Sequence, residues 1–389
     1  MKIFTSGVSD KRKAYMILAV FGMLIVALTV ISAFFQKGRA YGGGGETESG
    51  YLYDLLASGV VYASASGVEQ SFWPESGPDA DAAPDSSAGC NVLVLGKDYD
   101  SNRTDAIICV SFDFKNGAVS TLQIPRDTYV KDGDYAGRIN TLLPRYRAAA
   151  AEAGSKTPLT DGITRLMAKI EADFGIKCDN FIFLDSAAVE RLTDAMGGVT
   201  VDVPADIDYT DGARGLDLHL KEGRQHMDGK TASQFVRYRQ GYLQADLGRI
   251  NAQKLYAAAM LGKLASFSSV TTAAGLVNTL ASCVTTDLTA EDIGYLVTKL
   301  CLADSASVVM YTMPGDGAEV NGASYYGVNK DKYYEILIKA FTHGFPPVAA
   351  SLTVQDFPGK GGGFTDTDGV KLSSILDHGI GIPVYVGNR

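Results

Sequence analysis

Arginine and aspartate side chains gather in clusters at the predicted ends of strands and helices. Arginine suits phosphate because its planar guanidinium donates two parallel hydrogen bonds and stays charged. Carboxylates that share one place repel each other unless a hard divalent cation joins them, and Mg²⁺ prefers one or two carboxylates together with phosphate oxygens. The clusters therefore predict a Mg²⁺-assisted diphosphate site, although any single member taken alone is more typical of solvated surface. They are Asp98; Arg103 with Asp105; Arg126 with Asp127; Arg138 with Asn140; Arg237 with Arg239; and Asp246 with Arg249 and Gln253.

Other kinds of chemistry have weaker support in the sequence. The 389 residues include four histidines, and none of them has metal-ligand spacing to Glu or Cys. A G-x-S-x-G nucleophile motif is absent, and the glycine-rich segment 359–363 lacks the spacing of a nucleotide-binding loop. The net charge of −9 disfavours a protein whose main partner is nucleic acid, because such proteins are usually basic.

Alternating strands and helices have to position the clusters. Short apolar β-rich runs predict strands, and apolar residues at helical spacing predict helices between them. This alternation predicts a layered α/β domain with a central mixed sheet over residues 90–345, and ligands of open α/β sheets bind at strand ends. We expect residues 346–389 to form either an edge of the sheet or a loosely attached C-terminal segment, since they are glycine-rich with strand-like pieces at 351–354 and 382–386. The predicted strands are 91–96, 106–112, 118–124, 180–184, 199–203 and 308–313, and the predicted helices are 159–174, 187–196, 228–235, 246–267, 289–302 and 329–341.

The first 89 residues predict a membrane anchor and a linker. Residues 14–36 form an uncharged apolar run of 23 residues, long enough for a helix to cross the hydrocarbon core. The basic tip at 1–13 favours a cytoplasmic N-terminus and an extracytoplasmic body. A cleaved signal peptide is the alternative, but its apolar region is usually shorter. The stretch 37–89 predicts a flexible acidic linker, since residues 41–89 contain eight Asp or Glu and no Lys or Arg.

The stretches around the clusters resemble the LytR–CpsA–Psr family of bacterial envelope proteins. The resemblance is carried, between residues 91 and 267, by LVLGKD, RTDAI, IPRDTYV, RIN, DAMGGVTVDVP, RQHMDGKTASQFVRYR and DLGRINAQ. It implies an αβα sandwich that is anchored to the cell membrane of a bacterium with a Gram-positive envelope. It also implies an Mg²⁺-dependent phosphotransferase that takes a glycopolymer from undecaprenyl pyrophosphate. The acceptor would be the C6 hydroxyl of peptidoglycan N-acetylmuramic acid, and undecaprenyl phosphate would be released.

The resemblance also implies roles for individual residues. Two carboxylates match the metal side of the family site, namely Asp98 and Asp105. Six residues match its diphosphate ligands, namely Arg103, Arg126, Arg237, Arg239, Arg249 and Gln253. The groups expected to act in the reaction are Asp105, Arg126, Arg237, Arg239 and Asp246. Asp246 either orients an arginine or helps to deprotonate the acceptor.

One position departs from the family pattern. Ala252 stands where the family usually has arginine. The predicted helix 246–267 therefore lacks one positive charge with which family members would hold the diphosphate. Two other functions therefore stay open beside the transferase. They are a non-catalytic polyprenyl-phosphate-binding scaffold and a polyprenyl pyrophosphatase, in which water replaces the acceptor hydroxyl.

Overall fold

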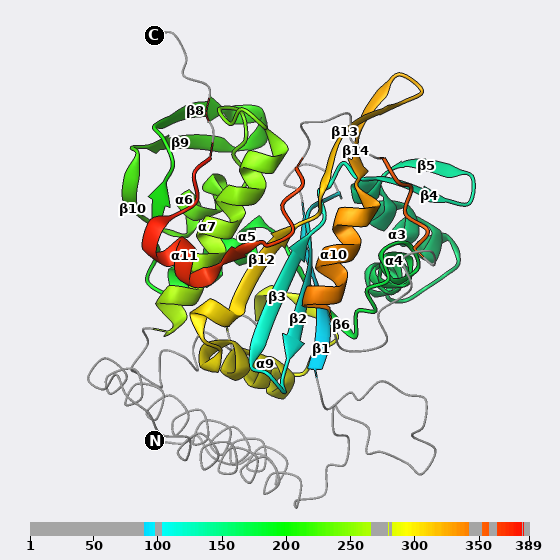
Figure 1. Cartoon of the computed structure of the whole chain (residues 1–389), viewed down its shortest axis with the longest axis horizontal. Helices are drawn as coiled ribbons and strands as arrows, with labels where there is room; N and C mark the ends of the chain where they lie inside the picture. The colour runs from blue at the N-terminus through cyan, green and yellow to red at the C-terminus, as the bar shows by residue number, and fades with distance from the viewer. Residues whose placement is uncertain are drawn as a thin grey trace, which may run out of the picture.

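The structure is a computed structural model that describes residues 89–97, 103–265, 279, 282–341, 352–357, 364–382 and 384. A mixed sheet of seven strands forms its centre (Figure 1). Their order across the sheet is β11 (Thr285–Thr286), β6 (Asn180–Leu184), β1 (Gly89–Lys97), β2 (Thr104–Asp113), β3 (Ala118–Gln123), β12 (Val308–Thr312) and β15 (Val370–Lys371). Strand β2 pairs antiparallel with β1 and with β3. Strand β6 pairs parallel with β1, and β12 pairs parallel with β3.

Two apolar cores lie on the two faces of this sheet. Leu93 and Leu95 of β1 belong to the first core and Val92 to the second, because successive side chains of a strand point to opposite faces. The first core is covered by α3 (Leu142–Glu152), α4 (Pro158–Phe174) and α10 (Lys330–Ala340). The second is covered by α6 (Gly229–Phe235), α7 (Asp246–Ala265), α9 (Ala290–Leu302) and α11 (Leu372–His378), and α5 (Ser186–Ala195) packs on α6. Figure 1 shows α3 and α4 on one side of the sheet and α6 and α7 on the other, which confirms the αβα sandwich.

Capping residues account for several helix ends that the sequence predicts. Thr289 and Asp292 form a complete capping box at the start of α9. Asn329 caps α10 by accepting a hydrogen bond of 3.0 Å from the Lys332 backbone N–H. Gly175 ends α4 with a φ of 70°, a left-handed conformation that glycine adopts without steric cost.

Four antiparallel pairs of strands extend from the central sheet. They are β4 (Tyr129–Asp132) with β5 (Tyr135–Arg138), β7 (Val199–Val203) with β10 (Gly223–Met227), β8 (Ile207–Asp211) with β9 (Leu216–Leu220), and β13 (Gly315–Val320) with β14 (Ala323–Val328). Short 3₁₀ turns occur at η1 (Ile139–Thr141), η2 (Gly212–Arg214) and η3 (Ser305–Ser307). Of these ribbons the sequence predicted only 199–203, and it also missed α3 and α11.

The C-terminal range 346–389 adds to the same fold, through different residues from those expected. β15 is the edge strand next to β12, and α11 packs against α7. The pieces expected as strands do not form them in the described residues: Val354 is outside any strand, and Val384 makes a single bridge to Tyr242.

The segments 1–13 and 14–36, nearly all of 37–89, and Asp98 lie outside the described residues. The membrane anchor, its orientation and the acidic linker therefore stay predictions. Among the described residues, no helix has the length and apolar character needed to cross a bilayer.

Candidate functional site

The topology of the central strands brings the first clusters to one edge of the sheet. Because β2 runs antiparallel to β3, the start of β2 lies beside the end of β3. Asp105 is the second residue of β2, and Arg126 follows β3 in a turn that Thr128 closes by donating its N–H and its hydroxyl to the Pro125 carbonyl. The Asn140 N–H donates to the Arg126 carbonyl at 3.2 Å. These backbone bonds fix the point from which the Arg126 side chain extends.

Helix α7 brings the second group of residues to the same place. Asp246 is its first residue, where a carboxylate is favoured by the helix dipole. Arg249 lies one turn later, so both side chains point from the helix start toward Arg126 and Asp105. The segment between α6 and α7 carries Arg237 and Arg239.

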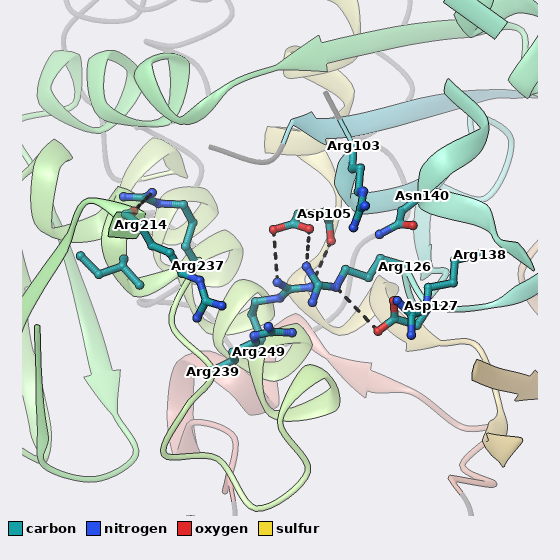
Figure 2. A pocket seen from close by; sticks show the side chains of 11 residues that line it. Arg103, Asp105, Arg126, Asp127, Arg138, Asn140, Arg214, Arg237, Arg239 and Arg249 are labelled. Atoms are coloured by element: carbon teal, nitrogen blue, oxygen red, sulfur yellow. Dashed lines mark hydrogen bonds and ion pairs between the residues drawn. The ribbon is translucent and has the colours of Figure 1, made fainter. Parts of the chain in front are cut away.

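Together these elements surround a cavity of about 450 Å³ (Figure 2). Its lining is mostly arginine: seven guanidinium groups face two carboxylates, one amide and one leucine. The lining residues are Arg103, Asp105, Arg126, Asp127, Arg138, Asn140, Arg214, Leu216, Arg237, Arg239 and Arg249. Such an excess of fixed guanidinium groups in a partly closed site attracts anions, and phosphate above all.

Asp105 and Asp246 hold the arginines at the centre of the cavity. Asp105 Oδ1 lies 2.6 Å from Arg126 Nη1, and its Oδ2 lies 3.3 Å from Arg249 Nη1. Asp246 Oδ1 lies 2.9 Å from Arg249 Nη2, 3.2 Å from Arg126 Nε and 3.7 Å from Arg239 Nη1. The Arg249 side chain is only 2% exposed. The two carboxylates thus fix the directions of three guanidinium groups before any ligand arrives.

The pKa shifts of two arginines follow from this arrangement. Burial alone would lower the pKa of Arg126, but the charges of Asp246 and Asp105 outweigh it and raise that pKa above its ordinary value. The pKa of Arg239 is lowered, first by burial and then by the positive charges of Arg126 and Arg249, which Asp246 only partly offsets. Positive charge is therefore in excess around Arg239, and a bound anion would relieve it.

The outer part of the cavity contains Arg138 and Arg214. The sequence places Arg138 in a cluster without assigning it a role, and it does not identify Arg214. Arg138 Nε lies 3.3 Å from Asp127 Oδ1 and its Nη2 donates to the Ser324 carbonyl at 3.0 Å. Arg214 enters from the turn between β8 and β9. No motif marks Arg214 in the sequence, because the turn reaches the cavity only through long-range contacts.

Most of the predicted site residues meet in this one place. Asp105 and five of the six predicted diphosphate ligands line the cavity, and Asp246 contacts three of these ligands, Arg126, Arg239 and Arg249. Gln253 does not line it: its amide donates to the Val236 carbonyl at 3.1 Å and its oxygen accepts from Gln123. Ala252 is fully buried in the second core, away from the lining.

Metal ligands are sparse in this part of the molecule. The described residues contain no group of three or more His, Cys, Asp or Glu side chains able to hold a metal ion. Asp105 is the one predicted metal ligand that the structure describes, and it lines the cavity.

Known proteins are similar to this chain in sequence and in fold. Residues 63–341 match the model of the LytR_cpsA_psr family. A curated relative from Oceanobacillus iheyensis, a polyisoprenyl-teichoic acid–peptidoglycan teichoic acid transferase TagU, is 29% identical over 62% of this chain and 72% of its own. The protein of the same name from Bacillus anthracis is 27% identical over 65% of this chain and 78% of its own.

Two solved structures have the same fold. The crystal structure of B. subtilis TagV superposes with a TM-score of 0.52 at 23% identity, covering 66% of this chain and 98% of TagV. A LytR-Csp2A-Psr enzyme from Actinomyces oris superposes with a TM-score of 0.51 at 19% identity, covering 67% of this chain and 93% of that protein. Since the family model spans most of the chain, including every residue of the cavity, this protein belongs to the LytR–CpsA–Psr family.

Proposed function

We propose that this protein transfers a glycopolymer from a polyprenyl-pyrophosphate carrier to a peptidoglycan hydroxyl. The observation that carries the proposal is the arginine-lined cavity in which the partly buried Asp105 and Asp246 hold the arginines in place. Membership of the family, and relatives named as teichoic acid–peptidoglycan transferases, favour this reaction over other uses of an anion site.

The reaction forms one phosphorus–oxygen bond and breaks another. The acceptor hydroxyl attacks the sugar-linked phosphorus, the bond from this phosphorus to the bridging oxygen breaks, and polyprenyl phosphate leaves with that bonding pair. The hydroxyl proton passes to a base or to water. Arg126, Arg239 and Arg249 neutralise the charge that develops on the phosphoryl oxygens and on the leaving phosphate. We propose the C6 hydroxyl of N-acetylmuramic acid as the acceptor.

Asp246 has the position of an orienting group. It contacts Arg126, Arg239 and Arg249 at once and does not line the cavity. Of the two roles expected for it, orienting arginines is therefore the better supported. Asp105 and Asp127 are the carboxylates that face the cavity and could accept the proton there.

We propose Mg²⁺ as the cofactor, with Asp105 and Asp98 as its protein ligands. The donor chemistry of the cavity fits this ion, because Mg²⁺ needs only one or two carboxylates when phosphate oxygens complete its shell. Asp105 supplies such a carboxylate at the cavity wall, 16% exposed. When bound, the ion would polarise the diphosphate oxygens and add to the charge neutralisation by the arginines.

A single-pass anchor over residues 14–36 would hold this domain outside the cell membrane, near its lipid-linked substrate. Tethering raises the local concentration of a substrate that stays in the bilayer. The apolar length of the run and the basic residues before it support this topology.

A product assay with the full chain in lipid vesicles tests the function. The protein, Mg²⁺ and a polyprenyl-pyrophosphoryl disaccharide are incubated with and without a peptidoglycan oligomer, and polyprenyl phosphate release and acceptor mass are followed. We expect the acceptor to gain the glycan phosphate, and Arg126→Ala and Asp105→Ala to abolish this gain.

Two other results would replace the proposal. Release of polyprenyl phosphate and free glycan phosphate without acceptor gain would identify a pyrophosphatase. Tight binding of the lipid without turnover would identify a non-catalytic binder.

A further inference from the structure

The turn between β8 and β9 forms one wall of the cavity. This tip, residues 212–215, consists of η2 and Gly215, which has a left-handed φ of 59°. Asp211 closes the turn by accepting a hydrogen bond of 3.2 Å from the Arg214 N–H. Figure 2 shows Arg214 on the opposite side of the cavity from Arg138, with Asp105 and Arg126 between them. The tip thus places a guanidinium group at some distance from the carboxylate network.

Backbone contacts hold the tip against α6 and the segment after it. Arg237 Nη1 donates to the Arg214 carbonyl at 3.1 Å, its Nη2 to the Gly215 carbonyl at 3.3 Å, and its Nε to the Ser233 carbonyl at 3.1 Å. The Asp217 N–H donates to the Gln234 side chain at 2.6 Å. Arg237 therefore positions the tip, and this positioning uses backbone atoms of Arg214 and leaves its side chain for another task.

The Arg214 side chain is half exposed and lines the cavity. Its Nη1 lies 3.5 Å from Asp211 Oδ2, a contact that directs the guanidinium without burying it. Arg214 is also close enough to Arg239 for its positive charge to help lower the pKa of Arg239. An anion bound between these two arginines would be stabilised by both.

The charges of the cavity exceed those of a diphosphate. Seven arginines line the cavity, and the carboxylates of Asp105, Asp127, Asp211 and Asp246 lie against them, which leaves three positive charges. A diphosphate esterified at both ends carries one negative charge on each of its two phosphates, as phosphodiesters do. A further negative group on the substrate would match the remaining positive charge at the Arg214 side.

We propose that Arg214 is a specificity-determining residue that contacts an anionic group on the glycan of the substrate, beyond the diphosphate held by Arg126, Arg239 and Arg249. The ligand class is a phosphate or carboxylate substituent on the sugars nearest the diphosphate, since both present paired oxygens to a guanidinium fork. This inference rests on the proposed function, because it assumes a glycan attached to the bound diphosphate.

Binding measurements on the full chain in detergent test this inference. Three short-chain prenyl-pyrophosphoryl disaccharides are titrated: one with a neutral glycan, one with a glycerol phosphate on it, and one with a uronic acid in it. The variants are Arg214→Gln and the control Arg224→Gln, which removes an exposed arginine from β10 in the separate β7–β10 ribbon. Turnover with a peptidoglycan oligomer is measured in parallel.

We expect the wild type to bind one or both charged compounds about tenfold tighter than the neutral one, as a half-exposed charge-assisted contact allows. Arg214→Gln should lose most of this preference and Arg224→Gln should keep it. The response to phosphate or to carboxylate identifies which anion the site takes. Equal weakening of all three compounds by Arg214→Gln would place Arg214 on the diphosphate and overturn the proposal, as would unchanged binding of all three.

The two proposals can fail separately in this experiment. Absence of turnover by the wild type with every compound would contradict the transferase function. The binding ratios would still decide the role of Arg214.

Discussion

Replacing Asp105 by asparagine tests whether this carboxylate compensates buried positive charge. The change keeps the shape of the side chain but removes the charge that lies 2.6 Å from Arg126 and 3.3 Å from Arg249. Arg249 is 2% exposed, so its guanidinium has little access to water as a substitute partner. The variant should therefore be less stable than the wild type even in the absence of metal and substrate.

The contacts that remain set the size of the effect. Breaking a buried ion pair by removing one partner costs about 3–5 kcal/mol. Arg249 and Arg126 both keep Asp246, at 2.9 and 3.2 Å. We therefore expect the lower part of that range or slightly less, about 2–3 kcal/mol. For a domain of this size such a loss lowers the unfolding midpoint by roughly 4–10 °C.

Urea unfolding in low salt with a chelator present measures this loss without interference from Mg²⁺. Glu335→Gln is a suitable control, since it removes a carboxylate from an exposed pair with Lys332 on α10 and should cost less than about 1 kcal/mol. If Asp105→Asn were no less stable than Glu335→Gln, Asp105 would not compensate buried charge. The picture of an arginine cluster fixed before substrate binding would then be wrong.

Three further substitutions test the packing around the site. Lys254 is buried, and its Nζ donates a hydrogen bond of 3.2 Å to the Met310 carbonyl. Burial lowers the pKa of Lys254 to about 8. In urea unfolding, the free energy of unfolding of the wild type should therefore rise as the pH increases from 8 to 10.5, because the unfolded state binds more protons in this range. Lys254→Met should not show this rise, and its free energy of unfolding at pH 7 should exceed that of the wild type by up to about 3 kcal/mol. Gly229→Ala would bring a Cβ within 2.2 Å of the Glu190 carbonyl oxygen, so α6 should shift and thermal unfolding should show a loss of about 1–3 kcal/mol. Ala252→Arg would introduce a buried charge into the second core, and we expect a lower unfolding midpoint and no gain in diphosphate affinity by titration.

Local signals in the sequence were enough to predict the central part of the fold. Apolar runs marked β1, β2 and β3, and capping residues such as Thr289 and Asn329 marked helix starts. Apart from β7, the ribbon strands were missed because they span only four to six residues and contain few consecutive apolar residues, as in β8 and β9. Such short patterns form strands only when a partner strand and a supporting helix are present.

The site could be predicted as far as its residues lie in recognisable clusters. Arg126 and Arg249 are 123 positions apart, and only the antiparallel pairing of β2 with β3 and the placement of α7 bring them to one carboxylate. Gln253 lies in the same motif as Arg249, yet its amide bridges Gln123 and Val236 instead of facing the cavity. A motif thus identifies the helix that matters without showing which of its side chains reach the ligand.

Arg214 and Arg237 show how a tertiary contact can change the role that a motif suggests. The sequence places Arg237 among the phosphate ligands, and it does line the cavity. Its three side-chain nitrogens also donate to backbone carbonyls, two of them on the β8–β9 tip. Replacing Arg237 would therefore disturb the position of Arg214 as well as remove a charge. Loss of activity in an Arg237 variant therefore does not by itself show a phosphate contact. If the loss came only from displacement of the β8–β9 tip, Arg214→Gln should reproduce it; a larger loss in the Arg237 variant would indicate a role for the charge of Arg237 itself.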